Sequence, residues 1–427
     1  MSRGFASVLR IRNFTLLTAA SSMSQLGDRL THMLLITVIA VAQPGKLMAY
    51  STASLAFVLP TMLLAPIAGV LVDRWDKRKV VGVAHITQAG LWVTAAFLMI
   101  VLKSFVPFWV ALAIFFGLDV FNNTAVPALL PQLVARRKLL TANSVNLTFC
   151  RVATVLGMVI GGFLIKWTGW KYGIFINAST HLTAGLLALG ISGVFIAHHI
   201  SSSVPGPQPP TSGPSISGLV VHAFRQLFID LAEVVRVIGR NRLVGFVMAS
   251  LIVTQFISSV SYTILIYLVQ QVLKLGTGGV GIFAGFLAVG MIAGAASMTF
   301  IRKRINQPMV VIGSILLYGL MFLASPWLIT VWYMIVIALV AGVAFSWVGV
   351  VQSTMLQEEV PNEIRGRIFS TREFITNIAF LLTTLFIGTL GDLTSYKIVL
   401  VAIGAVLSTV AVIGWVFVRA MQRPARA

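Results

Sequence analysis

Four charged side chains lie near the centres of long apolar stretches of the sequence, and they are the residues best suited to chemistry. They are Asp28, Arg29, Asp119 and Arg151. A charged side chain at the centre of a bilayer costs about 2.5 to 3.5 kcal/mol to insert, so such residues face a polar interior or one another. Two carboxylates and two guanidinium groups would form a nearly neutral cluster, which lowers the cost of burial. We therefore predict that these residues serve ion coupling or substrate contact.

Asp28 is the best placed of these residues to carry a proton. Burial disfavours the charged carboxylate, so an interior that alternates between dry and wet would bind and release a proton there. Arg29 follows directly and points about 100° away around a helix, whereas His32, four residues on, shares the face of Asp28. The pair formed by Asp28 and His32 is thus either a proton or cation site or a satisfied hydrogen bond.

Asp119 and Arg151 also have two interpretations. They lie on consecutive apolar stretches that would form a hairpin, so they are either a fixed ion pair or members of the same site. Other polar residues in apolar stretches are weaker candidates to line the substrate path, because isolated polar side chains often hydrogen-bond between helices. These weaker candidates are Asn122, Asn123, Gln255, Tyr262, Gln352 and Asn377, together with His85, Gln88, Asn177 and His181.

The stretches that carry these residues are typical of transmembrane helices. The chain of 427 residues is 58% hydrophobic and only 10% charged, and its mean hydropathy of +0.96 lies outside the range of soluble proteins. Twelve stretches are each long enough to cross a hydrocarbon core of about 30 Å as a helix. They cover residues 13–42, 47–73, 79–102, 106–135, 139–168, 171–197, 243–272, 277–301, 307–325, 327–356, 366–391 and 395–419. We expect an all-α membrane protein.

The twelve stretches fall into two groups of six around a linker of different composition. We expect a six-helix bundle over residues 1–198, a cytoplasmic linker over 199–242 and a second bundle over 243–427. The linker begins with the proline- and serine-rich run SSSVPGPQPPTSGPS, which is typical of flexible or extended chain. Apolar residues then recur at helical spacing, which predicts an amphipathic helix on the membrane surface.

The distribution of basic residues predicts the orientation of the chain. The net charge is +20, but the basic residues form short clusters between apolar stretches. This distribution explains the excess of positive charge without nucleic-acid binding. On one side lie Arg74, Lys77, Arg78, Lys79, Arg136, Arg137, Lys138, Arg302, Lys303, Arg304, Arg365 and Arg367. Because cytoplasmic loops carry more lysine and arginine, both termini and the linker are expected in the cytoplasm of a bacterial cell, with the chain in the inner membrane. The single cysteine, Cys150, excludes a disulfide framework and a multi-thiolate metal site.

A short loop between the second and third stretches carries a recognisable motif. The loop reads GVLVDRWDKRKVV and places Gly69, Leu71, Asp73, Arg74 and Arg78 at the positions of the pattern G-x-L-x-D-R-x-G-R-(R/K). This pattern resembles the signature loop of the major facilitator superfamily, although Asp76 stands where many members have glycine. With LLTANSVNL at 139–147 and VPNEIRGRIFS at 360–370, the chain resembles the branch that contains macrolide-efflux proteins and the enterobactin exporter.

This resemblance implies a major facilitator fold with two six-helix bundles that work by alternating access. It also implies that Asp73 contacts the cytoplasmic start of the eleventh span, where free backbone N–H groups favour an anion. Arg365 or Arg367 would add an ion pair, so we expect a cytoplasmic gate in which Gly69, Arg74 and Arg78 also take part. The fifth span has Gly157 and Gly161, which favour close helix packing, but Met158 replaces the proline of the superfamily's antiporter motif.

The function implied by the resemblance is proton-driven export of a small amphipathic or hydrophobic compound, such as a drug or a siderophore. We expect no enzyme activity, no cofactor and no resident metal, since neither a Walker loop nor an H-E-x-x-H motif occurs. The expected partners are the small-molecule substrate, protons and membrane lipids, and the expected state is a monomer. Three alternatives remain open: a lysophospholipid flippase, a metal exporter and a non-transporting scaffold. The metal exporter is suggested by GDRLTH at 27–32, which resembles the ferroportin pattern G-D-R-x-x-H.

Overall fold

The computed structural model describes residues 2–192, 241–301, 306–360 and 362–422, together with Arg225, Ile229 and Arg236. The regular elements among these residues are helices, which confirms the expected all-α class. The chain divides into two compact units, residues 1–38 with 56–227 and residues 39–55 with 228–427. Each unit is described in turn. The expected amphipathic helix of the linker lies mostly outside the described residues and stays a prediction.

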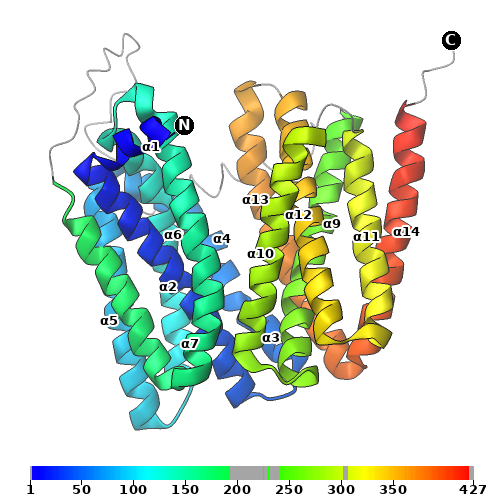
Figure 1. Cartoon of the computed structure of the whole chain (residues 1–427), viewed down its shortest axis with the longest axis horizontal. Helices are drawn as coiled ribbons and strands as arrows, with labels where there is room; N and C mark the ends of the chain where they lie inside the picture. The colour runs from blue at the N-terminus through cyan, green and yellow to red at the C-terminus, as the bar shows by residue number, and fades with distance from the viewer. Residues whose placement is uncertain are drawn as a thin grey trace. The chain divides into compact units, whose positions relative to one another are not determined.

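Unit 1 consists of helices from the first half of the chain (Figure 1). These helices are α1 (Ser2–Leu9), α2 (Arg12–Ala42), α4 (Leu55–Arg74), α5 (Lys77–Leu102), α6 (Val106–Leu133) and α7 (Leu139–Leu189), with a short turn η1 (Arg136–Lys138) before α7. Within the unit, α5 packs against both α6 and α7. Trp92 of α5 is fully buried there, with ring centroids 5.5 Å from those of Phe108 and Phe115 on α6. This aromatic packing fixes the helices that carry the polar residues.

Helix α7 contains two of the predicted spans. Its 51 residues would extend over roughly 75 Å as one straight helix, far more than a bilayer requires. Gly169 interrupts it with φ 72° and ψ 174°, a conformation that only glycine adopts readily. The chain turns back at this residue, and the green helix in Figure 1 is the part of α7 that follows the turn. The eleven candidate spans of the described residues therefore correspond to the twelve predicted from hydropathy.

The second predicted span is not one continuous helix. The structure divides it into α3 (Leu47–Ala53) and α4, with Ser54 between them. Ser54 donates its Oγ hydroxyl to the carbonyl oxygen of Ser51 at 2.7 Å and its amide to the same oxygen at 3.1 Å, which closes a tight local turn. Residues 39–55 belong to unit 2, so the two halves of this span pack in different units.

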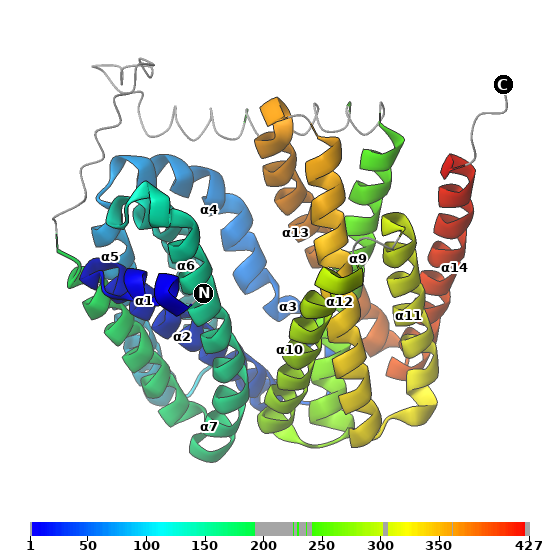
Figure 2. The same cartoon turned by 45° about the horizontal axis from the view of Figure 1, so that its top comes forward.

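Unit 2 contains α3 and the helices of the second half of the chain (Figure 2). They are α9 (Arg242–Tyr267), the π-helical turn η2 (Leu268–Val272), α10 (Gly276–Ile301), α11 (Gln307–Leu328), α12 (Val331–Glu359), α13 (Asn362–Leu393) and α14 (Tyr396–Gln422). Helix α10 packs against α12, α11 against α14, and both α9 and α3 against α13. Gly294 permits the first contact, because a Cβ there would lie 2.7 Å from the carbonyl oxygen of Val343 on α12.

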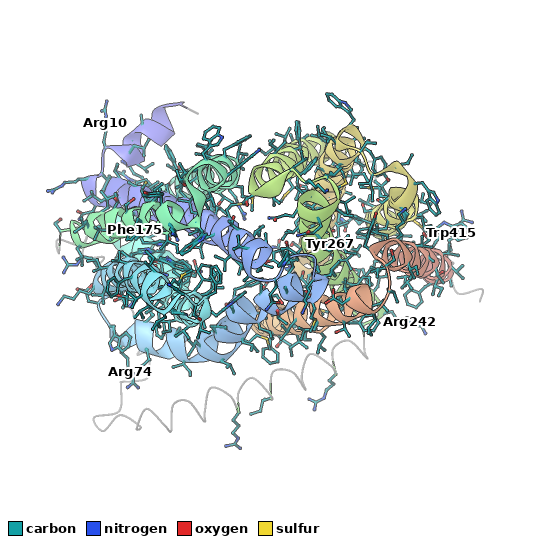
Figure 3. The ribbon with its side chains drawn as sticks, turned by 90° about the horizontal axis from the view of Figure 1, so that it is seen from below. Arg10, Arg74, Phe175, Arg242, Tyr267 and Trp415 are labelled. Carbon is teal, nitrogen blue, oxygen red and sulfur yellow. The ribbon has the colours of Figure 1, made fainter. Side chains whose placement is uncertain are left out.

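Exposed tryptophans lie near the ends of several helices, where a bilayer has its interfaces. Trp167, Trp327 and Trp332 are 77%, 75% and 79% exposed, respectively. Trp415 also points outward in Figure 3, and the guanidinium carbon of Arg419 lies 4.0 Å from its ring centroid. Amphipathic aromatic rings favour the headgroup level of a membrane, so these positions agree with a multi-pass membrane protein.

Several contacts bring basic segments of unit 1 to one end of it. Lys138 Nζ donates to the carbonyl oxygen of Ser7 at 3.3 Å, which holds α1 beside η1. Arg78 Nη1 donates to the carbonyl oxygen of Ile191 at 2.9 Å, and Ser192 donates its amide to Asn13 Oδ1 at 3.1 Å. The N-terminal segment, the loop before α5 and the end of α7 therefore lie together, as the predicted orientation requires.

Candidate functional site

The first carboxylate of the candidate site lies on α2, deep in unit 1. Asp28 is only 5% exposed. Its Oδ2 accepts a hydrogen bond from Gln25 Nε2 at 3.3 Å, and its Oδ1 has no partner among the described residues. Gln25 in turn accepts a hydrogen bond at Oε1 from Thr154 Oγ1 of α7 at 3.1 Å. Sequence reasoning missed Gln25, although its position one turn before Asp28 on the same helix face would have indicated it.

The second carboxylate lies on α6 and comes within electrostatic range of the first. Asp119 Oδ2 accepts a hydrogen bond from Asn123 Nδ2 at 2.8 Å, and its Oδ1 has no partner among the described residues. Asp28 and Asp119 act on each other, and Arg29 acts on both. The ion pairs within 4.0 Å between described residues do not include Arg29. Arg29 therefore acts on the two carboxylates at a distance, without a direct ion pair to either.

Arg151 does not join this group. Its side chain is exposed on α7, and no ion pair within 4.0 Å links it to Asp119 in the described part of the chain. The reason is the packing of α7, whose glycine face lies against α2: a Cβ at Gly157 would be 2.9 Å from Arg29 Cβ and 3.1 Å from the Leu26 backbone. The predicted close packing at Gly157 is confirmed, and the interpretation of Asp119 and Arg151 as a fixed ion pair is wrong.

His32 lies in an aromatic environment. Its ring centroid is 5.6 Å from that of Phe116 and 5.7 Å from that of Phe57, and these two phenylalanines are 5.6 Å apart. Arg29 lies within electrostatic range of the imidazole. The hydrogen bond described for Asp28 comes from Gln25, not from His32. A functional pair of Asp28 and His32 therefore stays a prediction.

Two of the weaker polar candidates hold helices of unit 1 together. With its amide oriented to suit its neighbours, Asn177 donates to the carbonyl oxygen of Gly27 at 2.8 Å. Its Oδ1 accepts from Thr31 Oγ1 at 2.8 Å and from Trp92 Nε1 at 3.1 Å. Gln88 Nε2 donates to the carbonyl oxygen of Phe115 at 3.2 Å. These bonds agree with the helix-to-helix role that isolated polar residues often have.

The candidates in unit 2 are less concentrated. Gln352 of α12 is 2% exposed and donates Nε2 to Ser250 Oγ at 2.9 Å and to Thr254 Oγ1 at 3.0 Å, which joins α12 to α9. Tyr262 lies with its ring centroid 6.0 Å from that of Phe380, and Gln255 and Asn377 are partly exposed. The buried aspartate and histidine side chains of the described residues all lie in unit 1. Unit 2 also buries polar side chains, which carry hydroxyl or amide groups, so the concentration of the site in the first half of the chain stays a prediction.

The expected cytoplasmic gate is described only in part. Asp76, which replaces the usual glycine of the motif, caps α5 by accepting the Arg78 amide at Oδ1 at 3.1 Å and pairs with Arg78 Nη2 at 3.3 Å. Gly69 lies in α4, and the exposed Arg74 is its last residue. The side chains of Asp73, Arg365 and Arg367 lie outside the described residues, so the gate between them stays a prediction.

A metal site needs several ligating side chains close together. Among the described residues, no three histidine, cysteine, aspartate or glutamate side chains lie close enough together to hold a metal ion. His32 faces Phe57 and Phe116 rather than a second ligand.

The sequence has relatives among known transporters. An uncharacterised MFS-type transporter of Mycobacterium tuberculosis is 25% identical over 387 residues, which cover 88% of this chain and 84% of that protein. The enterobactin exporter EntS of Escherichia coli is 27% identical over 326 residues, which cover 71% of this chain and 67% of that protein.

Solved structures show the same fold. A mutant of the nucleoside transporter NupG matches with a TM-score of 0.69 at 14% identity and covers 96% of this chain and 100% of that one. A bacterial homologue of the iron transporter ferroportin, in an inward-facing state, matches with a TM-score of 0.68 at 17% identity, over 97% of this chain and 100% of that one. The family model of the Major Facilitator Superfamily matches residues 14–370. The chain therefore belongs to the major facilitator superfamily, a family of multi-pass membrane transporters that is generally non-enzymatic.

Proposed function

We propose that this transporter exports a small amphipathic or hydrophobic compound, such as a drug or a siderophore, and that inward movement of protons drives the export. The protein works by alternating access as a monomer in the bacterial inner membrane, with both termini in the cytoplasm. Its similarity to the enterobactin exporter supports the direction of transport and the class of substrate.

The observation that carries the proton coupling is the pair of carboxylates in unit 1. Asp28 and Asp119 lie within electrostatic range of each other, each with one oxygen that has no partner among the described residues. With Arg29, the group has a formal charge of −1 when both acids are ionised. Burial of a net charge is unfavourable, so one added proton neutralises the group at the depth where water is scarce. A substrate or water that enters this site makes the net negative charge less unfavourable, and the proton is then released.

The test is transport into inverted membrane vesicles against a panel of compounds, with and without an imposed pH gradient. The panel contains macrolides, catecholate siderophores, a fluorescent lysophospholipid and divalent metal ions. We expect accumulation of an amphipathic compound that requires the gradient, and we expect Asp28→Asn to abolish this requirement. Accumulation by the wild type without a gradient would contradict the coupling, and unchanged coupling in the variant would remove Asp28 from it.

A metal exporter is the second candidate, because Gly27, Asp28, Arg29 and His32 match the ferroportin-like pattern. The distinguishing variant is His32→Ala, whose effect should differ between the two functions. If the protein exports amphipathic compounds, metal flux is at the background level in the wild type, and His32→Ala leaves it there. Gradient-dependent uptake of a divalent ion that disappears in His32→Ala would instead favour the metal exporter.

A further inference from the structure

A second titratable group lies in unit 1 beside the carboxylates, and the proposed function makes no use of it. His85 of α5 is 1% exposed and His181 of α7 is 0% exposed. Their ring centroids are 5.7 Å apart and their planes differ by 32°. The ring of Phe115 covers His181 edge-on, with a centroid distance of 5.0 Å. Two imidazoles thus face each other inside a transmembrane bundle, where a polar side chain is costly to bury without a partner.

The hydrogen bonds of Gln88 indicate which nitrogen of His85 can accept a proton. Gln88 Nε2 donates to the carbonyl oxygen of Phe115 at 3.2 Å, so its Oε1 points the other way, toward His85 Nδ1 at 2.8 Å. An amide oxygen only accepts, so the Nδ1 of His85 carries the hydrogen. In the neutral ring, Nε2 then has a free lone pair. This Nε2 and both ring nitrogens of His181 have no hydrogen-bond partner in the described part of the chain.

The two histidines are connected to the carboxylates on both sides. Asn122 of α6 lies beside both His85 and Asp119. On α2, Gly27 precedes Asp28 and packs directly on His181, because a Cβ at Gly27 would lie 2.6 Å from His181 Nε2. The four helices α2, α5, α6 and α7 therefore meet at one polar centre. The charged groups that face this centre from α2 and α6 are Asp28, Arg29 and Asp119.

We propose that His85 and His181 form a proton-binding pair that takes up a single proton. One ring becomes an imidazolium while the ring beside it stays neutral, because two positive charges at this separation inside a bundle would repel each other. The proton comes from the carboxyl group of Asp28 or Asp119 and leaves a carboxylate behind, so the total charge of the centre does not change. The pair is a second binding site for the coupling proton, and this role rests on the proposed function.

The proton-binding pair is tested directly by nuclear magnetic resonance of the full-length protein in lipid nanodiscs with isotope-labelled histidine. The chain has six histidines, and His85→Gln and His181→Gln assign the two signals. As the pH falls from mildly alkaline to mildly acidic, we expect the two rings to take up one proton together. Replacement of either histidine should change the titration of the other. Two independent titrations, or no titration of either ring over this range, would overturn the proposal.

The role in transport is tested with the compound that the vesicle assay identifies. We expect His181→Gln to lower gradient-driven accumulation by about tenfold, the change that a loss of about 1.4 kcal/mol in proton binding produces. Substrate exchange without a gradient should stay within about twofold, because exchange needs no net proton movement. Ser179→Ala is the matched control, since Ser179 is exposed on the same helix and its hydroxyl donates to the nearby carbonyl oxygen of Ile176 at 2.6 Å.

The two assays separate the possible failures. If resonance shows a shared proton but wild-type transport needs no gradient, the proposed coupling is wrong and the pair remains a proton site. If transport needs the gradient and both histidine variants keep wild-type accumulation, the pair has no part in coupling and the proposed role is wrong. A variant that loses both exchange and the resonance pattern has lost its fold, and the remaining variant of the pair then decides.

Discussion

At the scale of single residues, Gly157 makes a close contact with α2. A Cβ at this position would lie 2.9 Å from Arg29 Cβ and 3.1 Å from the Leu26 backbone, which cannot give way. We expect Gly157→Leu to push α7 away from α2 and to destabilise the protein by about 1 to 3 kcal/mol. Thermal unfolding in detergent measures this loss. Gly90→Leu is the control, because a Cβ at Gly90 meets nothing within 4 Å.

Gln352 provides a residue-scale test in unit 2. Its Nε2 donates to hydroxyls that each also donate to a backbone carbonyl, Ser250 Oγ to Val247 at 2.8 Å and Thr254 Oγ1 to Ser250 at 2.8 Å. Gln352→Met therefore leaves no hydroxyl donor unpaired, and we expect a small loss of about 0.6 kcal/mol per bond. The midpoint of thermal unfolding should fall slightly. A loss as large as that of Gly157→Leu would contradict this description of Gln352.

At the scale of elements, α3 depends on a residue of another helix. Lys46 provides no side-chain cap for this short helix. Instead, Asp392 of α13 accepts the Leu47 amide at Oδ1 at 2.7 Å and the Met48 amide at Oδ2 at 3.3 Å. Gly391 permits this approach, because a Cβ there would lie 2.9 Å from Leu47 Cδ2. The carboxylate of Asp392 thus fixes α3 to α13 within unit 2.

We expect Asp392→Ala to weaken the attachment of α3 by about 0.5 to 2 kcal/mol, as the loss of a helix cap does. Asp392→Asn keeps an acceptor oxygen and should have a smaller effect. Reaction of Met48→Cys with a membrane-impermeant maleimide, in a Cys150→Ser background, measures the release of α3. Equal labelling of the alanine variant and the parent would contradict a capping role for Asp392.

The elements themselves were largely predictable, and their partners were not. Hydropathy places most of the spans within a few residues, because each must cross the same hydrocarbon thickness. The sixth span, predicted to end at residue 197, ends at Leu189. Hydropathy does not show the break at Ser54 or which unit α3 joins, because both depend on local hydrogen bonds and packing. Asp28 and Asp119 were found because charge in an apolar stretch is rare. The sequence did not show that Arg151 makes no ion pair with Asp119, because it does not tell which way α7 turns its face; a part for Arg151 in the substrate path stays a prediction.

The histidine pair shows the same limit. His85 and His181 lie 96 positions apart in the chain, and each alone resembles an ordinary hydrogen-bonding residue in a helix. Only the packing of α5 against α7 brings their rings together. Asp392 was missed for the same reason, because the amides that it accepts belong to another helix.

At the scale of the whole molecule, the orientation in the membrane has a direct test. Lys103 and Arg137 are both exposed and flank α6, so they lie at its opposite ends. Because Arg137 belongs to the basic clusters, we expect Arg137→Cys to react only from the cytoplasm and Lys103→Cys only from outside. Labelling of intact cells and of inverted vesicles in a Cys150→Ser background decides this. Reaction of both residues from one side would contradict the twelve-span topology, and the reverse pattern would contradict the orientation.

The central claim is that Asp28 and Asp119 hold a proton that the exported compound displaces. The most direct measurement is proton release when the compound identified in vesicles is added to purified wild-type protein in weakly buffered detergent solution. We predict that binding releases protons from the wild type and that the double variant Asp28→Asn with Asp119→Asn binds the compound without release. Binding to the wild type without proton release, or equal release by the double variant, would contradict the account.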